Sequence, residues 1–316
     1  MDEAKIETRL LNYIRNELKN PYISYLTPPK SLADLPETKI YTFQLENTSP
    51  KLQQKMILRI YPDHTYQIRA KMEEILHNYL ADNNYPAPRI HFQCSNTSIL
   101  GGRFTVMDFV QGETLYRYGK DIAKTFAEIS VKLHNIDPKP LQKKLAEAGI
   151  NESQYTGFSE REHFIETHKM GWLEPAINWL KDNRPISDNV ICHGDVHASN
   201  IMMNEGMVSG VLDWTLFCVD DPCRDVGSTL TLYKVVMPCY SPENRGVFAL
   251  RMEKFLDTYL GLRGLDLGKL GYYEALRCFS EMSEIGGRAV VQRERGVLGA
   301  SADRFTELTG VKLSPK

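Results

Sequence analysis

The sequence predicts an α+β protein of two lobes, with a small antiparallel β-sheet in the N-terminal lobe and a larger, mostly helical C-terminal lobe. Strand-like runs gather in the first part of the chain, at residues 39–45, 56–61 and 103–110. Long helical patterns dominate beyond residue 112, and only one short strand-rich stretch, residues 190–214, interrupts them. Strands that come first and helices that come after, without regular alternation, are typical of the α+β class.

An amphipathic helix is expected at the start of the chain. Ile6, Leu10, Ile14 and Leu18 recur at helical spacing in a polar segment. This segment lacks the apolar core of a secretory signal, and no run in the chain approaches the roughly 20 apolar residues of a membrane-spanning helix. We therefore expect a cytoplasmic protein. A stretch interrupted by prolines, residues 21–36, follows this helix.

The next elements are expected to be an antiparallel hairpin and a helix. Residues 39–45 alternate apolar and polar side chains, residues 56–61 are rich in strand-forming types, and a polar loop at 47–54 joins them. Apolar residues then return at helical spacing from residue 67 to 82. This helix must end before Pro86, because the residue that precedes a proline disfavours helical backbone.

The same patterns predict the rest of the chain. Residues 103–110 are expected to form a buried strand that ends in a turn at residues 111–112. Helices are expected at 122–136 and over much of 251–291, and the tail after Gly299 is expected to be loosely packed.

We place the boundary between the lobes after residue 109, which gives predicted domains of residues 1–109 and 110–316. The composition, 42% hydrophobic and 25% charged, is that of a globular protein. Lys and Arg number 38 against 40 Asp and Glu, so no global charge draws the chain toward nucleic acid or an anionic membrane. Six dispersed cysteines without a CxxC pair indicate reduced thiols, in agreement with a cytoplasmic location.

The residues that carry chemistry lie between Val190 and Asp225. A short apolar run leads into His193, Gly194 and Asp195, and Asn200 follows five residues after that aspartate.

Two β-rich runs, residues 200–203 and 207–212, flank a turn and should pair as a hairpin. Asn200 and Asp213 lie almost symmetrically about this turn, so their side-chain oxygens should return to the same end of the ribbon, where Asp195 also lies.

This arrangement of oxygens suits a hard cation and a phosphoryl-transfer reaction. Mg²⁺ favours a few carboxylate or amide oxygens together with substrate phosphates. A separate carboxylate can orient an acceptor hydroxyl and take its proton. Asp195 would be that base, and Asn200 and Asp213 would hold the metal.

The motif HGDVHASN, followed by LDW, resembles the signature of the aminoglycoside phosphotransferase and choline kinase superfamily, relatives of the protein kinases. Four further segments extend the resemblance over most of the chain: DPCRD, ISVKLHNID, YPAPRI and MDFVQGETL. The resemblance implies a protein-kinase-like fold with the active site between the lobes. It also implies a Mg²⁺-dependent kinase that uses ATP or GTP to phosphorylate a small molecule, with residues 1–109 as the nucleotide-binding lobe.

The resemblance also implies individual roles. Asp195 matches the catalytic base, His193 the residue that braces the catalytic loop, and Asn200 and Asp213 the Mg²⁺ ligands.

The remaining implied roles concern the nucleotide. Arg59 falls where the superfamily has a basic strand residue that contacts the nucleotide phosphates and pairs with a helix glutamate, which Glu73 matches. Asp108 and Val110 lie in the segment that resembles the hinge between the lobes, and they are expected to bind the cofactor.

The implied acceptor is a hydroxyl-bearing small molecule such as an amino-sugar, macrolide, choline or homoserine. Glu160, Glu162 and Glu166 lie where the resemblance places substrate-binding helices, and a cationic acceptor would suit them. A charged, solvated helix face explains the same residues.

Other interpretations remain open at this stage. Residues 32–40, where the phosphates would be covered, contain no glycine, which favours a catalytically silent, pseudokinase-like protein that binds nucleotide or acts as a scaffold. Glu74 could replace Glu73 as the partner of Arg59, or Arg59 could be a surface residue.

Some of the same residues also have alternative roles. Cys192, His193, Asp195 and His197 could instead form a transition-metal cluster, although such a cluster leaves the hairpin unexplained. Otherwise His197 is expected to be a hydrogen-bonded loop residue.

Two aspartates and a tryptophan downstream of the hairpin are further candidates. Asp221 and Asp225 could coordinate substrate amines, whereas Asp225 could instead cap the helix that follows. Trp214 is expected to pack in the core and not to stack on a ligand.

Overall fold

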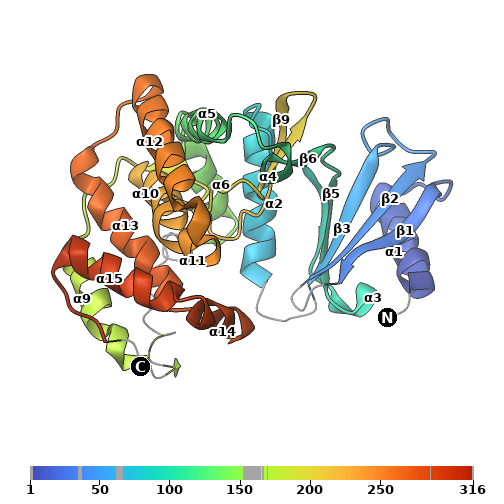
Figure 1. Cartoon of the computed structure of the whole chain (residues 1–316). Helices are drawn as coiled ribbons and strands as arrows, with labels where there is room; N and C mark the ends of the chain where they lie inside the picture. The colour runs from blue at the N-terminus through green and yellow to red at the C-terminus, as the bar shows by residue number, and fades with distance from the viewer. Residues whose placement is uncertain are drawn as a thin grey trace. The chain divides into compact units, whose positions relative to one another are not determined.

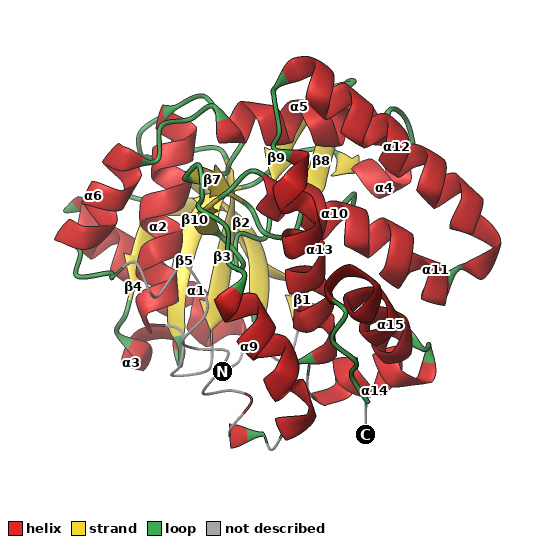
Figure 2. Ribbon diagram, turned by 90° about the vertical axis from the view of Figure 1, so that its left-hand side faces the viewer, coloured by secondary structure: helices red, strands yellow, loops and turns green. Residues whose placement is uncertain are grey.

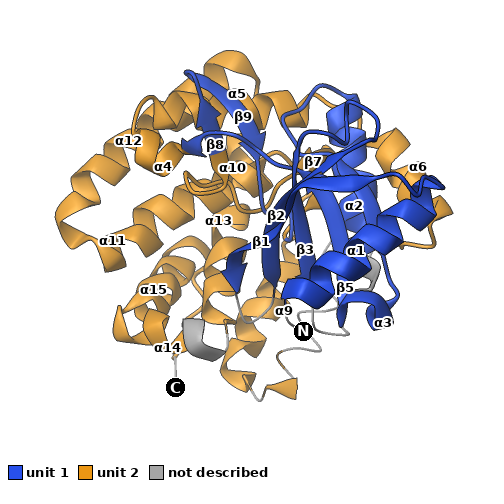
Figure 3. Cartoon of the chain, turned by 90° about the vertical axis from the view of Figure 1, so that its right-hand side faces the viewer, with its two compact units in different colours: residues 1–113, 202–215 blue, residues 114–201, 216–316 orange. Residues whose placement is uncertain are grey.

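The computed structural model confirms the α+β class, with an antiparallel sheet near the N-terminus and a helical remainder. It describes residues 3–34, 38–61, 67–151, 165, 167–168, 170–284 and 286–314, with the helix residues 67–69 and 286–288 described by backbone alone. The chain divides into two compact units (Figure 3): unit 1 comprises residues 1–113 and 202–215, and unit 2 comprises residues 114–201 and 216–316. The functional division into a nucleotide lobe and a substrate lobe at residue 109 stays a prediction.

Unit 1 is built on a five-stranded antiparallel sheet of order β1-β2-β3-β5-β4. Its elements are α1 (Glu3–Leu18), β1 (Ser24–Asp34), β2 (Lys39–Glu46), β3 (Lys55–Tyr61), α2 (Gln67–Asp82), β4 (Ile90–Cys94), α3 (Thr97–Leu100) and β5 (Arg103–Asp108). The predicted hairpin is β2 with β3, and the predicted helix at 67–82 is α2.

Helix α1 packs on one face of this sheet (Figure 1). Ile6, Leu10 and Ile14 are buried against sheet residues such as Phe43 and Phe104. Burying an apolar side chain of this size contributes about 1.5–3 kcal/mol, so this stripe holds the helix to the sheet. Arg59 and Tyr61 alternate with buried residues along β3, and both contact Glu73 on α2.

The sequence did not reveal β1 and β4. The prolines at 28 and 29 argue against a central strand, but β1 is an edge strand whose pairing with β2 has several register shifts. Proline is tolerated there because an edge strand leaves some backbone N–H groups without a ladder partner. Strand β4 buries only its two ends, Ile90 and Cys94, so it lacks the alternation that predicts a strand.

A second sheet, of order β6-β8-β9, contains the hairpin predicted downstream of Asp195. Its strands are β6 (Glu113–Thr114), β8 (Ile201–Asn204) and β9 (Met207–Val211). Glu205 and Gly206 form a two-residue turn with φ of 50° and 84°. Positive φ at both positions is the geometry of a type I′ turn, whose twist matches that of the two strands.

The hairpin is packed within unit 1 against the segment that follows β5. A Cβ at Gly112, where φ is +114°, would lie 2.0 Å from the Met203 carbonyl oxygen, and a Cβ at Gly210 would lie 2.6 Å from a Val110 methyl group. The Val211 N–H donates to the Pro86 carbonyl at 2.6 Å. Two glycines therefore allow the close contacts, one with backbone and one with a side chain, that pack this hairpin.

Unit 2 consists mainly of helices, which Figure 2 shows in red. The helices are α4 (Leu115–Tyr118), α5 (Ile122–His134), α6 (Lys139–Glu147), α9 (Glu174–Asp182), α10 (Cys223–Thr231), α11 (Met237–Tyr240), α12 (Arg245–Leu262), α13 (Leu267–Met282), α14 (Gly286–Glu294) and α15 (Val297–Thr309). Short 3₁₀ turns lie at Gly171–Leu173 and Pro242–Asn244, and a π-helical turn at Leu232–Val236. Strands β7 (Val190–Cys192) and β10 (Cys218–Asp220) pair antiparallel.

One prediction for this unit is confirmed and another was wrong. Helices cover much of 251–291, as predicted, in separate segments: α12 ends at an extended Arg263, and α13 starts with Asp266 as its N-cap, which accepts from the Gly268 N–H. The tail after Gly299 is well packed, since Phe305 on α15 is fully buried in the core that α9, α10 and α13 share. Among the described residues, no helix is both long and apolar enough to span a membrane.

Candidate active site

The loop from His193 to Asn200, called here the 193–200 loop, leaves β7 in unit 2 through a tight bend. Gly194 has φ of +83°, and a Cβ there would lie 2.2 Å from the Leu216 carbonyl oxygen. Only glycine can adopt this backbone conformation readily and also allow the Leu216 carbonyl to approach so closely. The position of Asp195 therefore depends on the glycine before it.

Asp225 on α10 anchors the start of this loop. Its Oδ2 accepts the His193 N–H at 2.9 Å, and its Oδ1 accepts the Gly194 N–H at 2.6 Å. His134 Nε2 lies 3.1 Å from Oδ2, and its Nδ1 lies 2.7 Å from the Tyr259 hydroxyl. Burial raises the pKa of the Asp225 carboxyl, but the hydrogen bond and charge of His134 outweigh it and leave the pKa below its ordinary value.

The prediction that Asp225 caps the next helix was wrong, and Asp221 has that role instead. Asp221 Oδ1 accepts the Cys223 N–H at 3.0 Å in the first turn of α10, and its Oδ2 pairs with Lys269 at 2.7 Å. Both aspartates are buried with internal partners, Asp225 at 0% and Asp221 at 1% exposure. Neither is placed to coordinate a substrate amine.

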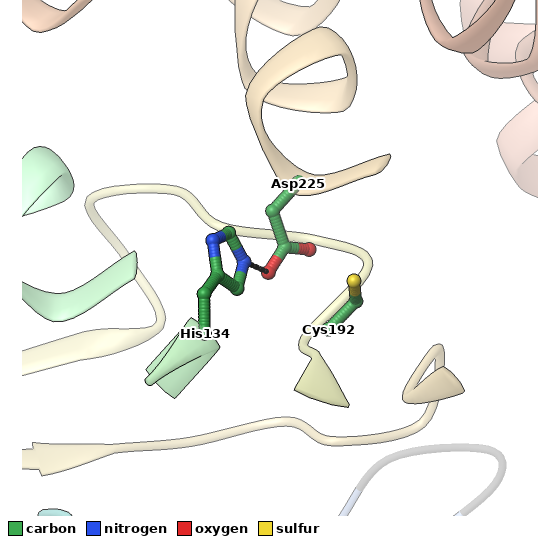
Figure 4. A group of neighbouring side chains, drawn as sticks. All are labelled: His134, Cys192 and Asp225. Atoms are coloured by element: carbon green, nitrogen blue, oxygen red, sulfur yellow. Dashed lines mark hydrogen bonds and ion pairs between the residues drawn. The ribbon is translucent and has the colours of Figure 1, made fainter. Parts of the chain in front are cut away.

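Figure 4 shows a buried trio, His134, Cys192 and Asp225, whose ligand-type atoms lie within 4.8 Å of one another. Each is already engaged: both His134 nitrogens and both Asp225 oxygens have partners, and the Cys192 thiol donates to the Asp221 carbonyl at 3.4 Å. Burial raises the pKa of the Cys192 thiol, which disfavours the thiolate that a metal requires. The trio is a hydrogen-bonded support for the loop.

The transition-metal alternative considered from the sequence is not supported. Among the described residues, the trio in Figure 4 is the group of potential ligands that converges, and it shares only Cys192 with the cluster of Cys192, His193, Asp195 and His197. His193 is fully buried, and its Nδ1 accepts the backbone N–H of Asp195 at 3.2 Å. This hydrogen bond links His193 to Asp195, and the role of His193 in a reaction stays a prediction.

The structure also brings Asn200 to Asp195. The Asn200 side-chain amide donates to the Asp195 carbonyl at 3.1 Å, which leaves its carboxamide oxygen as an acceptor. The middle of the loop is held from unit 2: Thr229 donates to the Val196 carbonyl, and the Ala198 N–H donates to Tyr233 in the π-helical turn. His193, Asp195 and Asn200 thus lie together on one restrained loop.

The Asp195 carboxylate has two basic neighbours. Arg277 Nη1 on α13 lies 2.8 Å from Oδ1, and His197 Nε2 lies 3.5 Å from Oδ2. Burial raises the pKa of this carboxyl, but the interaction with His197 and the charge of Arg277 outweigh it and hold the pKa well below its ordinary value. Asp195 is therefore ionised at neutral pH.

A pocket within unit 2 opens beside this carboxylate. It is lined by three carboxylates, those of Asp195, Glu281 and Glu284, and by two guanidinium groups, those of Arg224 and Arg277. A small polar ligand that enters it would therefore meet charges of both signs.

In unit 1, the structure brings Arg59 on β3 to Glu73 on α2. Arg59 Nη1 lies 3.7 Å from Glu73 Oε2, and the Tyr61 hydroxyl donates to the same oxygen at 3.1 Å. The alternative, Glu74, pairs with Lys71 at 2.7 Å. Glu73 is 4% exposed, so the basic strand residue and the helix glutamate form a partly buried pair.

The hinge candidates Asp108 and Val110 have structural partners of their own. Asp108 Oδ2 accepts the Arg89 N–H at 3.0 Å, and His91 Nε2 lies 2.6 Å from Oδ1. Burial raises the pKa of the Asp108 carboxyl. The hydrogen bonds from His91 and Arg89 lower this pKa by more than burial raises it, so it lies below its ordinary value. Val110 packs over Gly210. Their cofactor contacts stay predictions.

Asp213 follows β9 in unit 1 and is exposed. Its φ of 62° is a left-handed conformation that costs a non-glycine residue about 1–3 kcal/mol, so its surroundings must hold it. The Thr215 hydroxyl donates to Oδ1 at 2.8 Å. Trp214, 1% exposed, packs edge-on against Tyr85 and donates to the Val211 carbonyl, as the sequence predicted for a core residue.

The sequence did not identify Arg277. It lies 82 residues beyond Asp195 in a helical pattern, and no local motif marks it. The signal that could have marked Arg277 is a charged residue at a helix position that is buried in the fold. Sequence spacing alone could not show that this position contacts the 193–200 loop. Glu160, Glu162 and Glu166, proposed as substrate residues, lie outside the described residues.

Curated relatives of this chain are larger proteins. It is 26% identical over 255 residues to acyl-CoA dehydrogenase family member 11 of Rattus norvegicus and 28% identical over 247 residues to that of Homo sapiens. These matches cover 73% and 70% of this chain but only 32% and 31% of the relatives. The chain thus spans about a third of the length of the relatives it matches, and the dehydrogenase name describes those whole proteins.

Solved structures share the fold over nearly the whole chain. A putative aminoglycoside phosphotransferase from Ralstonia eutropha has a TM-score of 0.66 at 17% identity, covering 95% of this chain and 98% of that one. Aminoglycoside phosphotransferase APH(4)-Ia, with AMP-PNP and hygromycin B, has 0.64 at 12%, with coverages of 95% and 98%. A Plasmodium vivax ethanolamine kinase has 0.63 at 15%, with coverages of 96% and 86%.

The family follows from the sequence itself. The model of the phosphotransferase enzyme family matches residues 41–252, which is more than half of the chain and includes the 193–200 loop, Asp213 and Asp225. Together with the kinase-like fold and the restrained loop around Asp195, this match identifies the chain as a member of the phosphotransferase enzyme family.

Proposed function

We propose that this chain is a small-molecule kinase that transfers the γ-phosphate of ATP or GTP to a hydroxyl group of a low-molecular-weight acceptor, with Mg²⁺. The observation that carries the proposal is the ionised carboxylate of Asp195, held beside a pocket by the 193–200 loop. A bond forms between the acceptor oxygen and the γ-phosphorus, and the bond from that phosphorus to the nucleoside diphosphate breaks.

In this proposal Asp195 orients the acceptor hydroxyl and receives its proton. Because the pKa of Asp195 is held low, it is a weak base, and the proton transfers late, when bonding to phosphorus has made the hydroxyl acidic. Orientation is then the larger contribution, as in phosphoryl transfer generally. His193 supports this role by fixing the Asp195 backbone.

The donor chemistry of Asn200 and Asp213 fits Mg²⁺. The Asn200 amide nitrogen donates to the Asp195 carbonyl, which leaves its oxygen for a cation, and Asp213 is an exposed carboxylate with one oxygen bonded to Thr215. These are the hard oxygen ligands that Mg²⁺ prefers. Bound Mg²⁺ would neutralise charge on the nucleotide phosphates.

The nucleotide contacts are proposed for unit 1. The Arg59 and Glu73 pair supports them, because the buried Glu73 carboxylate restrains the Arg59 guanidinium, and a guanidinium group binds phosphate oxygens well. Asp108 and Val110 would contact the nucleotide at the segment after β5. The structural relative APH(4)-Ia, which binds AMP-PNP, supports a nucleoside triphosphate as the phosphate donor.

We propose a cationic or amino-bearing acceptor. The pocket beside Asp195 has three carboxylates and two guanidinium groups, which gives it a formal excess of negative charge. One structural relative is in complex with hygromycin B and another is named an ethanolamine kinase, which supports the same class. A cytoplasmic protein without a nucleic-acid or membrane partner is also part of the proposal, in keeping with the net charge of −2.

A second candidate is a catalytically silent protein that binds nucleotide. The observation in its favour is the connection between β1 and β2, which contains no glycine to let backbone amides approach phosphates.

Nucleotide binding followed by an acceptor screen distinguishes the two candidates. We expect ATP or GTP to raise the unfolding temperature only when Mg²⁺ is present, because a ligand that binds the native state stabilises it by RT ln(1 + [L]/Kd). We also expect labelled γ-phosphate to transfer to one of a panel of amino-sugars, choline, ethanolamine and homoserine. Stabilisation by nucleotide without transfer to any acceptor would favour the silent protein. No stabilisation by any nucleotide would contradict both.

A further inference from the structure

Arg277 is a buried arginine on α13 that contacts Asp195 directly. Only 7% of the residue is exposed. Its Nη1 donates to Asp195 Oδ1 at 2.8 Å and to the Ser228 hydroxyl at 3.0 Å. Its Nε donates to Glu281 Oε1 at 2.8 Å, and its Nη2 lies 2.7 Å from the same oxygen. Every nitrogen of the guanidinium group therefore has a partner.

Glu281 fixes the direction of this guanidinium. The two residues are four positions apart on α13, so their side chains lie on the same helix face. Gln292 on α14 donates to the other Glu281 oxygen at 2.7 Å, which leaves Glu281 little freedom to turn. The Glu281 carboxylate thus orients the Arg277 guanidinium, which in turn holds the Asp195 carboxylate.

Ser228 links the same guanidinium to the backbone of the 193–200 loop. Its hydroxyl accepts from Arg277 and donates to the Gly194 carbonyl at 3.1 Å. Arg277 therefore contacts both the Asp195 side chain and, through Ser228, the peptide group that precedes Asp195. Together these contacts restrain the rotation of the carboxylate about its own side-chain bonds.

We propose that Arg277 is a positioning residue for the transfer reaction, which holds the Asp195 carboxylate in the orientation that an acceptor hydroxyl requires. The inference rests on the proposed function. A lysine could not replace this arginine, because a single ammonium group cannot reach Asp195, Ser228 and Glu281 in the planar arrangement of a guanidinium. The loop's own His197 lies 3.5 Å from Oδ2 of the same carboxylate, whereas Arg277 holds Oδ1 at 2.8 Å.

The test compares kcat, KM and stability in Arg277→Met and Arg277→Lys. The assay uses Mg²⁺-ATP with an acceptor that the wild-type protein phosphorylates. We expect kcat to fall roughly 10- to 100-fold in both variants, as expected when a catalytic group is displaced by about 1 Å, with KM for ATP nearly unchanged. A third variant, Arg277→Ala, tests rescue: added guanidinium ion should restore part of its kcat, whereas methylammonium should not.

Arg304→Met is the matched control. Arg304 on α15 makes the same kind of ion pair, 2.7 Å to Glu274, but contacts neither the 193–200 loop nor Asp195 in any described contact. It should keep the wild-type kcat while losing stability. Arg277→Lys keeps the buried positive charge, so it remains informative if Arg277→Met does not fold.

The outcomes separate this inference from the proposed function. A wild-type kcat in Arg277→Met or Arg277→Lys, or a loss that appears only in KM or in stability, overturns the positioning role while the kinase proposal stands. A wild-type protein that phosphorylates no acceptor overturns the proposed function, and the positioning role falls with it.

Discussion

At the scale of single residues, the site depends on a few side chains whose environments determine their state. Asp195 is ionised because His197 and Arg277 outweigh the cost of burying its charge. Asp225 is ionised for the same kind of reason, with His134 as its partner, and it uses that charge to accept two backbone N–H groups. Charge-assisted hydrogen bonds of this kind are stronger than neutral ones.

Replacement of Gly194 should disable the site. Gly194→Ala places a Cβ 2.2 Å from the Leu216 carbonyl and requires a left-handed alanine, which alone costs about 1–2 kcal/mol. We expect a lower free energy of unfolding in urea and a large loss of kcat. Gly261→Ala is the control, because no atom lies within 4 Å of its Cβ and the helix should gain about 0.5–1 kcal/mol. Equal effects of the two variants would contradict the role of Gly194.

The charge of Asp225 should make stability depend on pH. Its folded pKa lies below the ordinary value, so its contribution is fully present above the unfolded pKa, about 3.9, and is lost as pH falls from there through the folded pKa. Asp225→Asn should therefore be less stable than wild type at pH 7, and the difference should shrink below about pH 4. Urea unfolding of both proteins at pH 7, 5, 4 and 3 measures this difference in stability. A difference that is constant with pH would show that the charge contributes nothing.

At the scale of elements, most helices and strands could be predicted because their side chains alternate or recur in a single pattern. α1, α2 and the β8–β9 hairpin are of this kind, since each buries one regular face or has a glycine turn. β1 could not be predicted, because its acceptance of two prolines depends on its place at the edge of the sheet.

The same limit applies to the site. His193, Asp195 and Asn200 lie within eight residues, so their contacts could be anticipated from a motif. The contacts of Asp195 with Arg277 and of Asp225 with His134 join residues 82 and 91 positions apart. Only packing of α5, α10 and α13 establishes them.

The hairpin turn offers a stabilising change. Glu205 has φ of 50°, in a turn type where asparagine is preferred at this position. Glu205→Asn should raise the free energy of unfolding by about 0.5–1 kcal/mol, because asparagine tolerates the left-handed conformation better than glutamate. Chemical denaturation measures the change, and kcat should be unaffected since no contact among the described residues joins this turn to a proposed site residue. A decrease in stability would mean that the turn does not have this geometry in solution.

At the scale of the whole molecule, the predicted residues are distributed over both compact units. Unit 1 contains the Arg59 and Glu73 pair, Asp108, Val110 and Asp213, whereas unit 2 contains His193, Asp195 and Asn200. Contacts inside its own unit restrain each group: the Thr215 hydroxyl bonds Asp213, Asp225 holds the backbone at Gly194, and Arg277 bonds Asp195. The proposed reaction needs both groups, because it transfers the γ-phosphate from a nucleotide to an acceptor.

The most direct measurement is phosphate transfer by Asp195→Ala, with nucleotide binding followed in the same preparation. Asp257→Asn, a change of an exposed carboxylate on α12, is the control and should behave as wild type. We expect Asp195→Ala to lose transfer by about 10²-fold or more, since it removes the group that we propose to orient and deprotonate the acceptor, while nucleotide with Mg²⁺ still raises its unfolding temperature. Transfer that survives in Asp195→Ala would contradict the assignment of Asp195 as the base.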